Sequence, residues 1–135
     1  MGGTRETMNE LRHKDVWSGE YKGIHYEVVN WGKNMKYKPE GTWNYYVYLN
    51  VLDFPKKYHK HLWLREGRSY YDCIFGGEVY WHGGCTYYEK WNTNPKQVKF
   101  GCDFAHSWDD GQEYDLEAVA HYARKTIDEI VEYKE

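Results

Sequence analysis

The stretch CTYYEKWNTNPKQVKFGCDF, residues 85–104, indicates a β-hairpin around which the rest of the chain can be arranged. Residues 85–91 and 97–104 are rich in aromatic and β-branched side chains, and the turn formers NTNPK separate them. With the turn at the centre of NTNPK, Glu89 lies opposite Lys99. The residues before and after the hairpin should therefore meet at its open end.

Two short runs flank that open end. YWHGGCTYYEKW (80–91) leads into the first strand, and GCDFAHSWDD (101–110) includes the end of the second. Gly83 and Gly84 remove two side chains here, which leaves room for a ligand or for another backbone. The side chains expected to converge are Cys85 opposite Asp103, His82 near His106, and Asp109 beside them.

The preceding segments predict the neighbours of the hairpin. TWNYYVYLNVL (42–52) is an alternating strand, and GEYKGIHYEVVNW (19–31) is a second strand with a bend at Gly23. Pro55 is well placed to open a short helix. The segment REGRSYYDCIFGGE (65–78) predicts a loop, or a weak strand around 70–75.

The C-terminal region predicts one amphipathic helix that Asp115 can cap. Its apolar residues follow helical spacing; they are Leu116, Val119, Ala120, Ala123, Ile127, Ile130 and Val131. We therefore predict an α+β fold, an antiparallel sheet of about four or five strands packed against a C-terminal helix. Residues 1–15 would form a polar N-terminal arm and residues 16–135 a single α+β domain.

Composition narrows the classes of function. The net charge is −3, with eight Lys/Arg against three acids in residues 33–70 and six against thirteen in 71–135. This balance argues against general nucleic-acid binding, which needs a basic surface. An excess of aromatics (15 Tyr, 7 Trp and 4 Phe) favours a binding surface. No apolar run predicts a membrane span, no secretory signal is visible, and three cysteines suit the cytoplasm.

Four interpretations of the cluster at the open end remain. Its histidines and aspartates could hold Zn²⁺ or Mn²⁺, but it has no HxH, HExxH or paired CxxC spacing, so we expect no metal or other cofactor. Metal-free catalysis would use Cys85 beside a histidine, or a His–Asp dyad. A non-catalytic pocket would use His82, Asp103 and His106 beside aromatic rings. In a purely structural interpretation, the glycines form a bulge and the polar side chains tie the helix start to the sheet.

The same residues resemble the core of a group of small, uncharacterised phage and prophage proteins. The recurring pattern is His-Gly-Gly-x-Thr-Tyr/Phe, then Gly-x-Asp-x-Ala-His-x-x-Asp, then a closing helix. The matching residues here are His82, Gly83, Gly84, Thr86, Tyr87, Gly101, Asp103, Ala105, His106 and Asp109. The resemblance implies phage biology in the cytoplasm of a bacterial host, more than any particular activity.

We therefore expect a phage-type accessory binding protein rather than an enzyme. It would counter host defence by sequestering a nucleotide-like small molecule or by inhibiting a host defence protein. The expected ligand-binding residues are Trp43, Tyr45, Trp81, His82, Gly83, Gly84, Thr86, Tyr87, Asp103, His106 and Asp109. The alternative is a small metal-assisted hydrolase or phosphoesterase that uses the cluster of His82, Asp103 and His106. Homo-oligomers remain compatible with the sequence.

Overall fold

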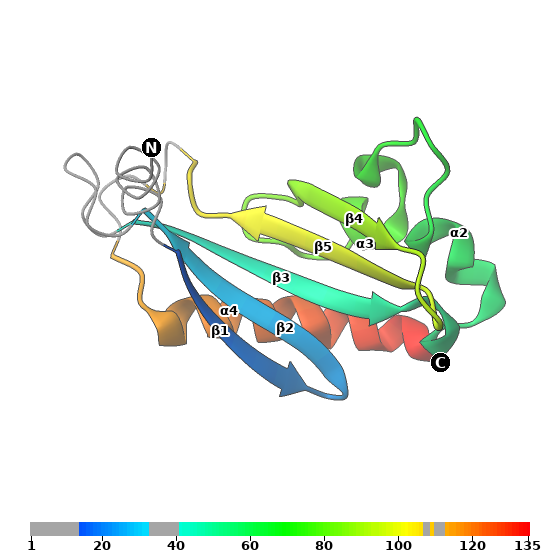
Figure 1. The fold of residues 1–135 in the computed structure, drawn as a ribbon, viewed down its shortest axis with the longest axis horizontal. Helices are drawn as coiled ribbons and strands as arrows, with labels where there is room; N and C mark the ends of the chain where they lie inside the picture. Colours follow the sequence, from blue (N-terminus) through cyan, green and yellow to red (C-terminus); the bar gives the residue numbers. More distant parts are fainter. Residues whose placement is uncertain (1–13, 33–40, 107–108, 110–112) are drawn as a thin grey trace, which may run out of the picture.

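Five antiparallel strands form one twisted sheet, and a long C-terminal helix runs along one of its faces (Figure 1). The computed structural model describes residues 14–32, 41–106, 109 and 113–135. The strands are β1 (Lys14–Tyr21), β2 (Ile24–Trp31), β3 (Thr42–Asn50), β4 (Tyr87–Trp91) and β5 (Gln97–Asp103). Their spatial order is β1-β2-β3-β5-β4, so β1 and β4 are the edges. The predicted α+β fold is confirmed.

Strands β1 and β2 form a hairpin, whereas the sequence predicts one strand with a bend at Gly23. The chain reverses at Lys22 and Gly23, whose φ angles of 50° and 79° are both in the left-handed region. Two such residues in succession are typical of the tight two-residue turn that matches strand twist. Lys14 and Asp15 belong to β1 rather than to the predicted arm, and the rest of that arm lies outside the described residues.

The hairpin of β4 and β5 has the predicted register. Glu89 lies opposite Lys99, and the ladder begins with Tyr87 opposite Gly101. The predicted pairing of Cys85 with Asp103 is not formed, because the ladder between β4 and β5 begins only at Tyr87 and Gly101. The two runs at the open end of the hairpin nevertheless leave the sheet side by side.

Short helical segments connect β3 to β4. They are η1 (Val51–Asp53), η2 (Lys56–Tyr58), α2 (His59–Leu62), η3 (Tyr70–Asp72) and α3 (Ile74–Gly77). The helix predicted after Pro55 is present as η2 and α2. The weak strand predicted over 70–75 is wrong, because local caps favour helical turns: the Ser69 hydroxyl accepts from the Tyr71 N–H, and Cys73 Sγ accepts from the Gly76 N–H.

The helix α4 (Leu116–Ile130), continued by η5 (Val131–Lys134), covers β2 and β3. It begins as predicted, with Asp115 Oδ1 accepting from the Ala118 N–H at 2.8 Å. Most of the predicted stripe is buried, together with Thr126, whereas Leu116 is partly exposed. On the same face, the ring of Phe75 from α3 packs on Phe100 of β5. None of the described helices could span a membrane.

One polar chain crosses this core. The hydroxyl of Tyr45 donates to Thr126 Oγ1 at 2.8 Å and accepts from the backbone N–H of His82 at 3.0 Å. Thr126 in turn donates to the carbonyl of Tyr80 at 2.8 Å. Sheet, helix and the segment before β4 are therefore joined at Tyr45, whose side chain is fully buried.

We expect Tyr45→Phe to lower the free energy of unfolding by about 2 kcal/mol, because the hydroxyl that bonds both Thr126 and the buried N–H of His82 is removed. Thermal or urea unfolding measures the change. Tyr71→Phe is the matched control, since Tyr71 is exposed and should unfold like the wild type. Equal stability of the two variants would contradict a structural role for the Tyr45 hydroxyl.

Candidate metal centre

The segment before β4 makes a tight turn that presents His82. The N–H of Gly84 donates to the carbonyl of Trp81 at 2.9 Å, which closes a four-residue turn. Gly83 and Gly84 have φ angles of 69° and 98°, a region that glycine adopts without the strain other residues incur. The His82 side chain is buried within this turn.

Asp109 is the centre of a hydrogen-bond network that joins this turn to the segment after β5. Its Oδ1 accepts from His82 Nε2 at 2.9 Å and from the Tyr114 hydroxyl at 2.6 Å. Its Oδ2 accepts from the backbone N–H and the Nδ1–H of His106, both at 3.0 Å. An ionised carboxylate can only accept hydrogen bonds, so His82 Nε2 and His106 Nδ1 must each carry a proton and donate it to Asp109.

The network keeps the Asp109 carboxylate ionised. Burial by itself would raise the pKa of Asp109, but the hydrogen bonds from Tyr114, His82 and His106 outweigh that effect, and the pKa is lowered. Burial and the bond to Asp109 raise the pKa of Tyr114, so its hydroxyl stays a donor. The site therefore holds one fixed negative charge between two imidazoles.

Aromatic packing fixes the orientation of the first imidazole. The His82 ring stacks on Phe104 with centroids 3.8 Å apart and planes 8° apart, and the rings of Tyr114 and Tyr122 approach it at 5.7 and 5.2 Å. His106 is the more open of the two, with 23% of its side chain exposed. Among the described residues of the network, His106 is therefore the one that a small ligand could contact most readily.

The geometry suits a divalent transition metal. His82, His106 and Asp109 each offer one ligand atom, and these atoms lie within 4.8 Å of one another. Two imidazoles and a carboxylate are a common ligand set for zinc when a fourth position is left to water. Asp103 Oδ1 lies 4.0 Å from His106 Nδ1 and adds a second carboxylate nearby. Metal binding would replace the two protons now shared with Asp109.

Without a metal, the contact between Asp109 and His106 has the arrangement of a His–Asp dyad, the pairing that metal-free acid–base catalysis would require. The nucleophile considered for such chemistry, Cys85, is sealed in the core, and burial raises the pKa of its thiol to about 11. A thiolate mechanism at Cys85 therefore does not fit this structure.

The structure brings together only part of the predicted ligand-binding set. His82, His106 and Asp109 form the network, with Gly83 against the His106 ring and Asp103 at its edge. Asp103 also accepts from the N–H of Ala105 at 3.1 Å, so it stabilises the turn that follows β5.

The other predicted ligand-binding residues lie elsewhere. Tyr45 and Trp81 are buried in the core, 5.7 Å apart, so their rings do not face solvent. Trp43, on the central strand β3, packs against Trp17 of the edge strand β1. Gly84 has open space where a Cβ would lie.

Thr86 and Tyr87 are exposed. Strand alternation places Tyr87 on the sheet face opposite α4, because its partner Gly101 follows the inward-facing Phe100. On that face the Tyr87 ring contacts Tyr46 at 5.3 Å, away from the His82 turn.

Sequence reasoning missed Tyr114 and Phe104 as parts of the site. Tyr114 precedes the helix cap and Phe104 directly follows β5, positions that carry no periodic signal of their own. Only the short separation of Tyr114 from Asp109 in the sequence hinted at their contact.

Comparison with protein-family models, curated proteins and solved structures finds no match to this chain. The resemblance to small phage proteins therefore stays a prediction. The geometry around Asp109 has to support any functional argument by itself.

Proposed function

We propose that this chain binds one divalent transition-metal ion, with Zn²⁺ the best fit, and uses it to hydrolyse a phosphate ester. The proposal is supported by one observation, the convergence of His82, His106 and Asp109 from two separate segments. Nitrogen and oxygen ligands of this kind suit zinc better than magnesium or calcium, which prefer oxygen alone. This is the metal-assisted alternative of the sequence analysis, with Asp109 rather than Asp103 as the carboxylate ligand.

The number of ligands favours a catalytic metal site over a closed structural one. Three protein ligands would leave a fourth position open for water, and a Zn²⁺ ion held there would supply a nucleophile at neutral pH by lowering the pKa of that water. The partly exposed side of His106 is where substrate and water would approach. The ion would also offset the negative charges of Asp109 and Asp103, which otherwise repel a phosphate.

The test begins with metal content. Protein loaded with Zn²⁺ and dialysed is expected to retain about one ion per chain, measured by elemental mass spectrometry. His106→Ala should lose the ion, whereas His121→Ala should keep it, because His121 is exposed on α4 and apart from the network. No retained zinc or manganese in the wild type would contradict the proposal and leave the network a structural tie.

Activity is the second measurement. Hydrolysis of bis(p-nitrophenyl) phosphate should depend on the loaded ion, stop with a chelator and recover when zinc is returned. If the protein retains the ion but hydrolyses neither phosphodiester nor phosphomonoester probes, the metal site is supported and the proposed hydrolase activity is contradicted.

A second candidate is the accessory binding protein expected from the sequence, which would hold a nucleotide-like molecule or a host defence protein in the bacterial cytoplasm. The specific observation in its favour is not at the metal centre. It is an apolar cavity with lysines at its rim at the other end of the sheet.

A further inference from the structure

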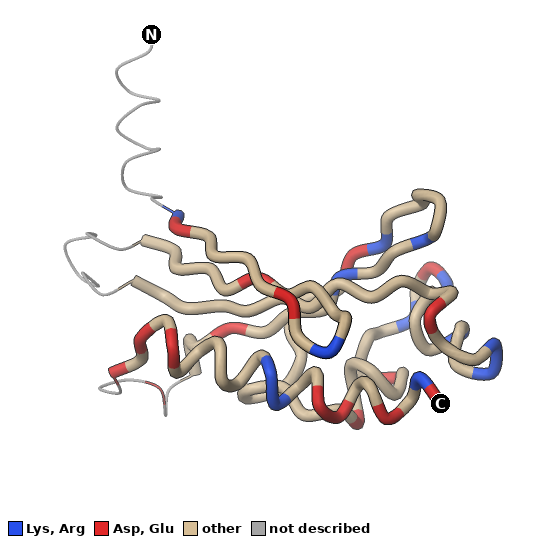
Figure 2. The backbone as a smooth tube through the Cα atoms, turned by 90° about the horizontal axis from the view of Figure 1, so that it is seen from below, with Lys and Arg blue, Asp and Glu red and all other residues tan. Residues whose placement is uncertain are grey.

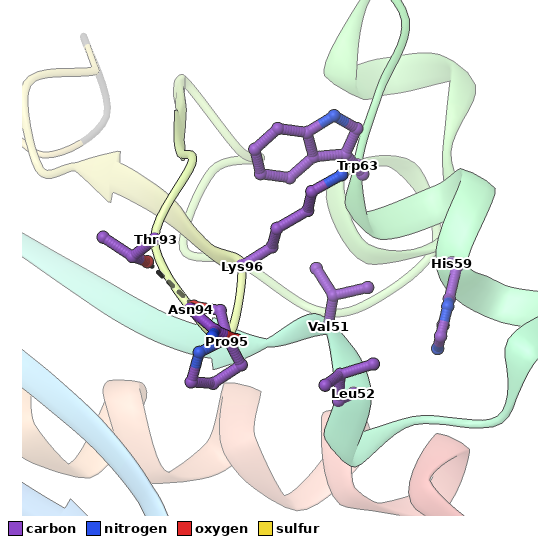
Figure 3. A pocket seen from close by; sticks show the side chains of 8 residues that line it. All are labelled: Val51, Leu52, His59, Trp63, Thr93, Asn94, Pro95 and Lys96. Atoms are coloured by element: carbon purple, nitrogen blue, oxygen red, sulfur yellow. Dashed lines mark hydrogen bonds between the residues drawn. The ribbon is translucent and has the colours of Figure 1, made fainter.

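A cavity of about 450 Å³ lies at the end of the sheet where β4 turns into β5, here called the Trp63 cavity. It is lined by Val51, Leu52, His59, Trp63, Thr93, Asn94, Pro95 and Lys96 (Figure 3). The metal centre follows the opposite end of β5, a strand of 7 residues, so the two sites are about 20 Å apart or more. The cavity is therefore a separate candidate site.

Three segments distant in the sequence build this cavity. Val51 and Leu52 come from η1, His59 and Trp63 from α2 and its end, and residues 93–96 from the β4–β5 turn. The Val51 N–H donates to the carbonyl of Lys96 at 3.0 Å, which holds η1 against the turn. The volume of the cavity lies in the range of small-molecule binding sites.

The cavity combines a flat aromatic surface with positive charge. Lys96 Nζ lies 4.9 Å from the centre of the Trp63 ring, and Lys90 Nζ lies 5.2 Å from it. In Figure 3 the Lys96 side chain extends towards the indole, and His59 stands across the hollow. His59 Nε2 donates to the carbonyl of Phe54 at 2.8 Å, which fixes its ring. None of the lining residues is acidic.

The surroundings share this charge. Lys56, Lys57 and Lys60 lie on η2 and α2 beside the cavity. In Figure 2 the basic residues gather at this end of the molecule, whereas acidic residues predominate along α4. An anionic ligand is therefore favoured here over a neutral or cationic one.

We propose that the Trp63 cavity binds a planar aromatic molecule with an anionic group, of the nucleoside monophosphate class. The base would stack on the indole of Trp63, and the phosphate would pair with Lys96, whose flexible side chain can leave the ring face to meet it. The inference is independent of the metal centre, and it supplies a ligand site for the second candidate function.

The test titrates the full chain with AMP, adenosine and inorganic phosphate in the presence of a chelator, followed by NMR of the tryptophan indole N–H groups. AMP should shift the Trp63 resonance and those of the 93–96 turn. Adenosine should bind at least about tenfold more weakly than AMP, because it lacks the charge that Lys96 meets.

Variants separate the cavity from other surfaces. Trp63→Leu and Lys96→Glu should each lower the affinity for AMP at least about tenfold. Trp63→Phe should retain most of that affinity. Lys125→Glu is the matched control, because Lys125 also lies over a ring, that of Tyr80, but at another surface. Lys96 is exposed, so its variant should fold normally.

Three outcomes would overturn the inference. The first is that AMP shifts no indole resonance. The second is that Lys96→Glu binds AMP as tightly as the wild type. The third is that His106→Ala loses AMP binding while Lys96→Glu retains it. The last result would place the nucleotide beside His106 rather than in the Trp63 cavity. Binding that survives His106→Ala but not Lys96→Glu supports the Trp63 cavity.

Discussion

Asp109→Ala is expected to lower the free energy of unfolding of the metal-free protein by about 3–5 kcal/mol. The carboxylate accepts four hydrogen bonds, from His82, from Tyr114 and twice from His106. Its removal leaves these donors in a largely buried site without their acceptor, and each unsatisfied buried donor costs about 1–3 kcal/mol. The melting temperature should fall by about 10 °C or more.

The same variant should abolish metal binding, because it removes one of three ligands. Two variants make the result interpretable. Asp109→Asn keeps one acceptor oxygen, so it should be more stable than Asp109→Ala yet bind zinc more than about 100-fold more weakly than the wild type. Asp128→Ala removes an exposed carboxylate that pairs with Lys22 at 2.7 Å, and its melting temperature should barely change.

The measurements are thermal unfolding in a chelator and zinc titration of the same preparations. If Asp109→Ala has the same melting temperature as the wild type, the network does not stabilise the fold. If it binds zinc as tightly as the wild type, Asp109 is not a ligand.

Gly83→Ala is expected to displace His106 and to weaken zinc binding by about 100-fold. A Cβ at this position would lie 2.2 Å from His106 Cε1 and 2.5 Å from its Nε2, far inside any real contact. The neighbouring atoms are those of the imidazole ring itself, so relief requires the ring and the Gly83 backbone to move apart, which disturbs the position of the ring relative to Asp109. The φ angle of 69° adds strain of about 1–2 kcal/mol for any residue with a side chain.

Gly84→Ala separates these two effects. Gly84 has a φ angle of 98°, but a Cβ there meets no atom within 4 Å. The control should therefore lose some stability through backbone strain and retain its zinc affinity. Equal zinc affinities for the two alanine variants would contradict the proposal that Gly83 exists to admit the His106 ring.

Much of the sheet was predictable because its strands alternate. Tyr45, Val47 and Leu49 mark the buried face of β3, and the turn formers NTNPK set the register of β4 and β5. The β1–β2 hairpin was missed because its turn consists only of Lys22 and Gly23, which resemble a bend within one long strand.

The segment over 70–75 was misjudged for a different reason. Its aromatic and β-branched residues favour a strand, but the Ser69 and Cys73 caps hold helical turns. Phe75 then packs against Phe54 and Phe100 in the core. Tertiary packing overrides weak strand propensity in such short segments.

For the candidate site, the sequence determined which segments meet, because strand register and helix periodicity are local patterns that record which face is buried. Only the tertiary structure decided the role of each side chain. An aromatic residue suits a core as well as a ligand site, so the burial of Tyr45 and Trp81 depended on how α4 and α3 cover the sheet. The four donors around Asp109 and the walls of the Trp63 cavity come from separate segments, and no local pattern records their convergence.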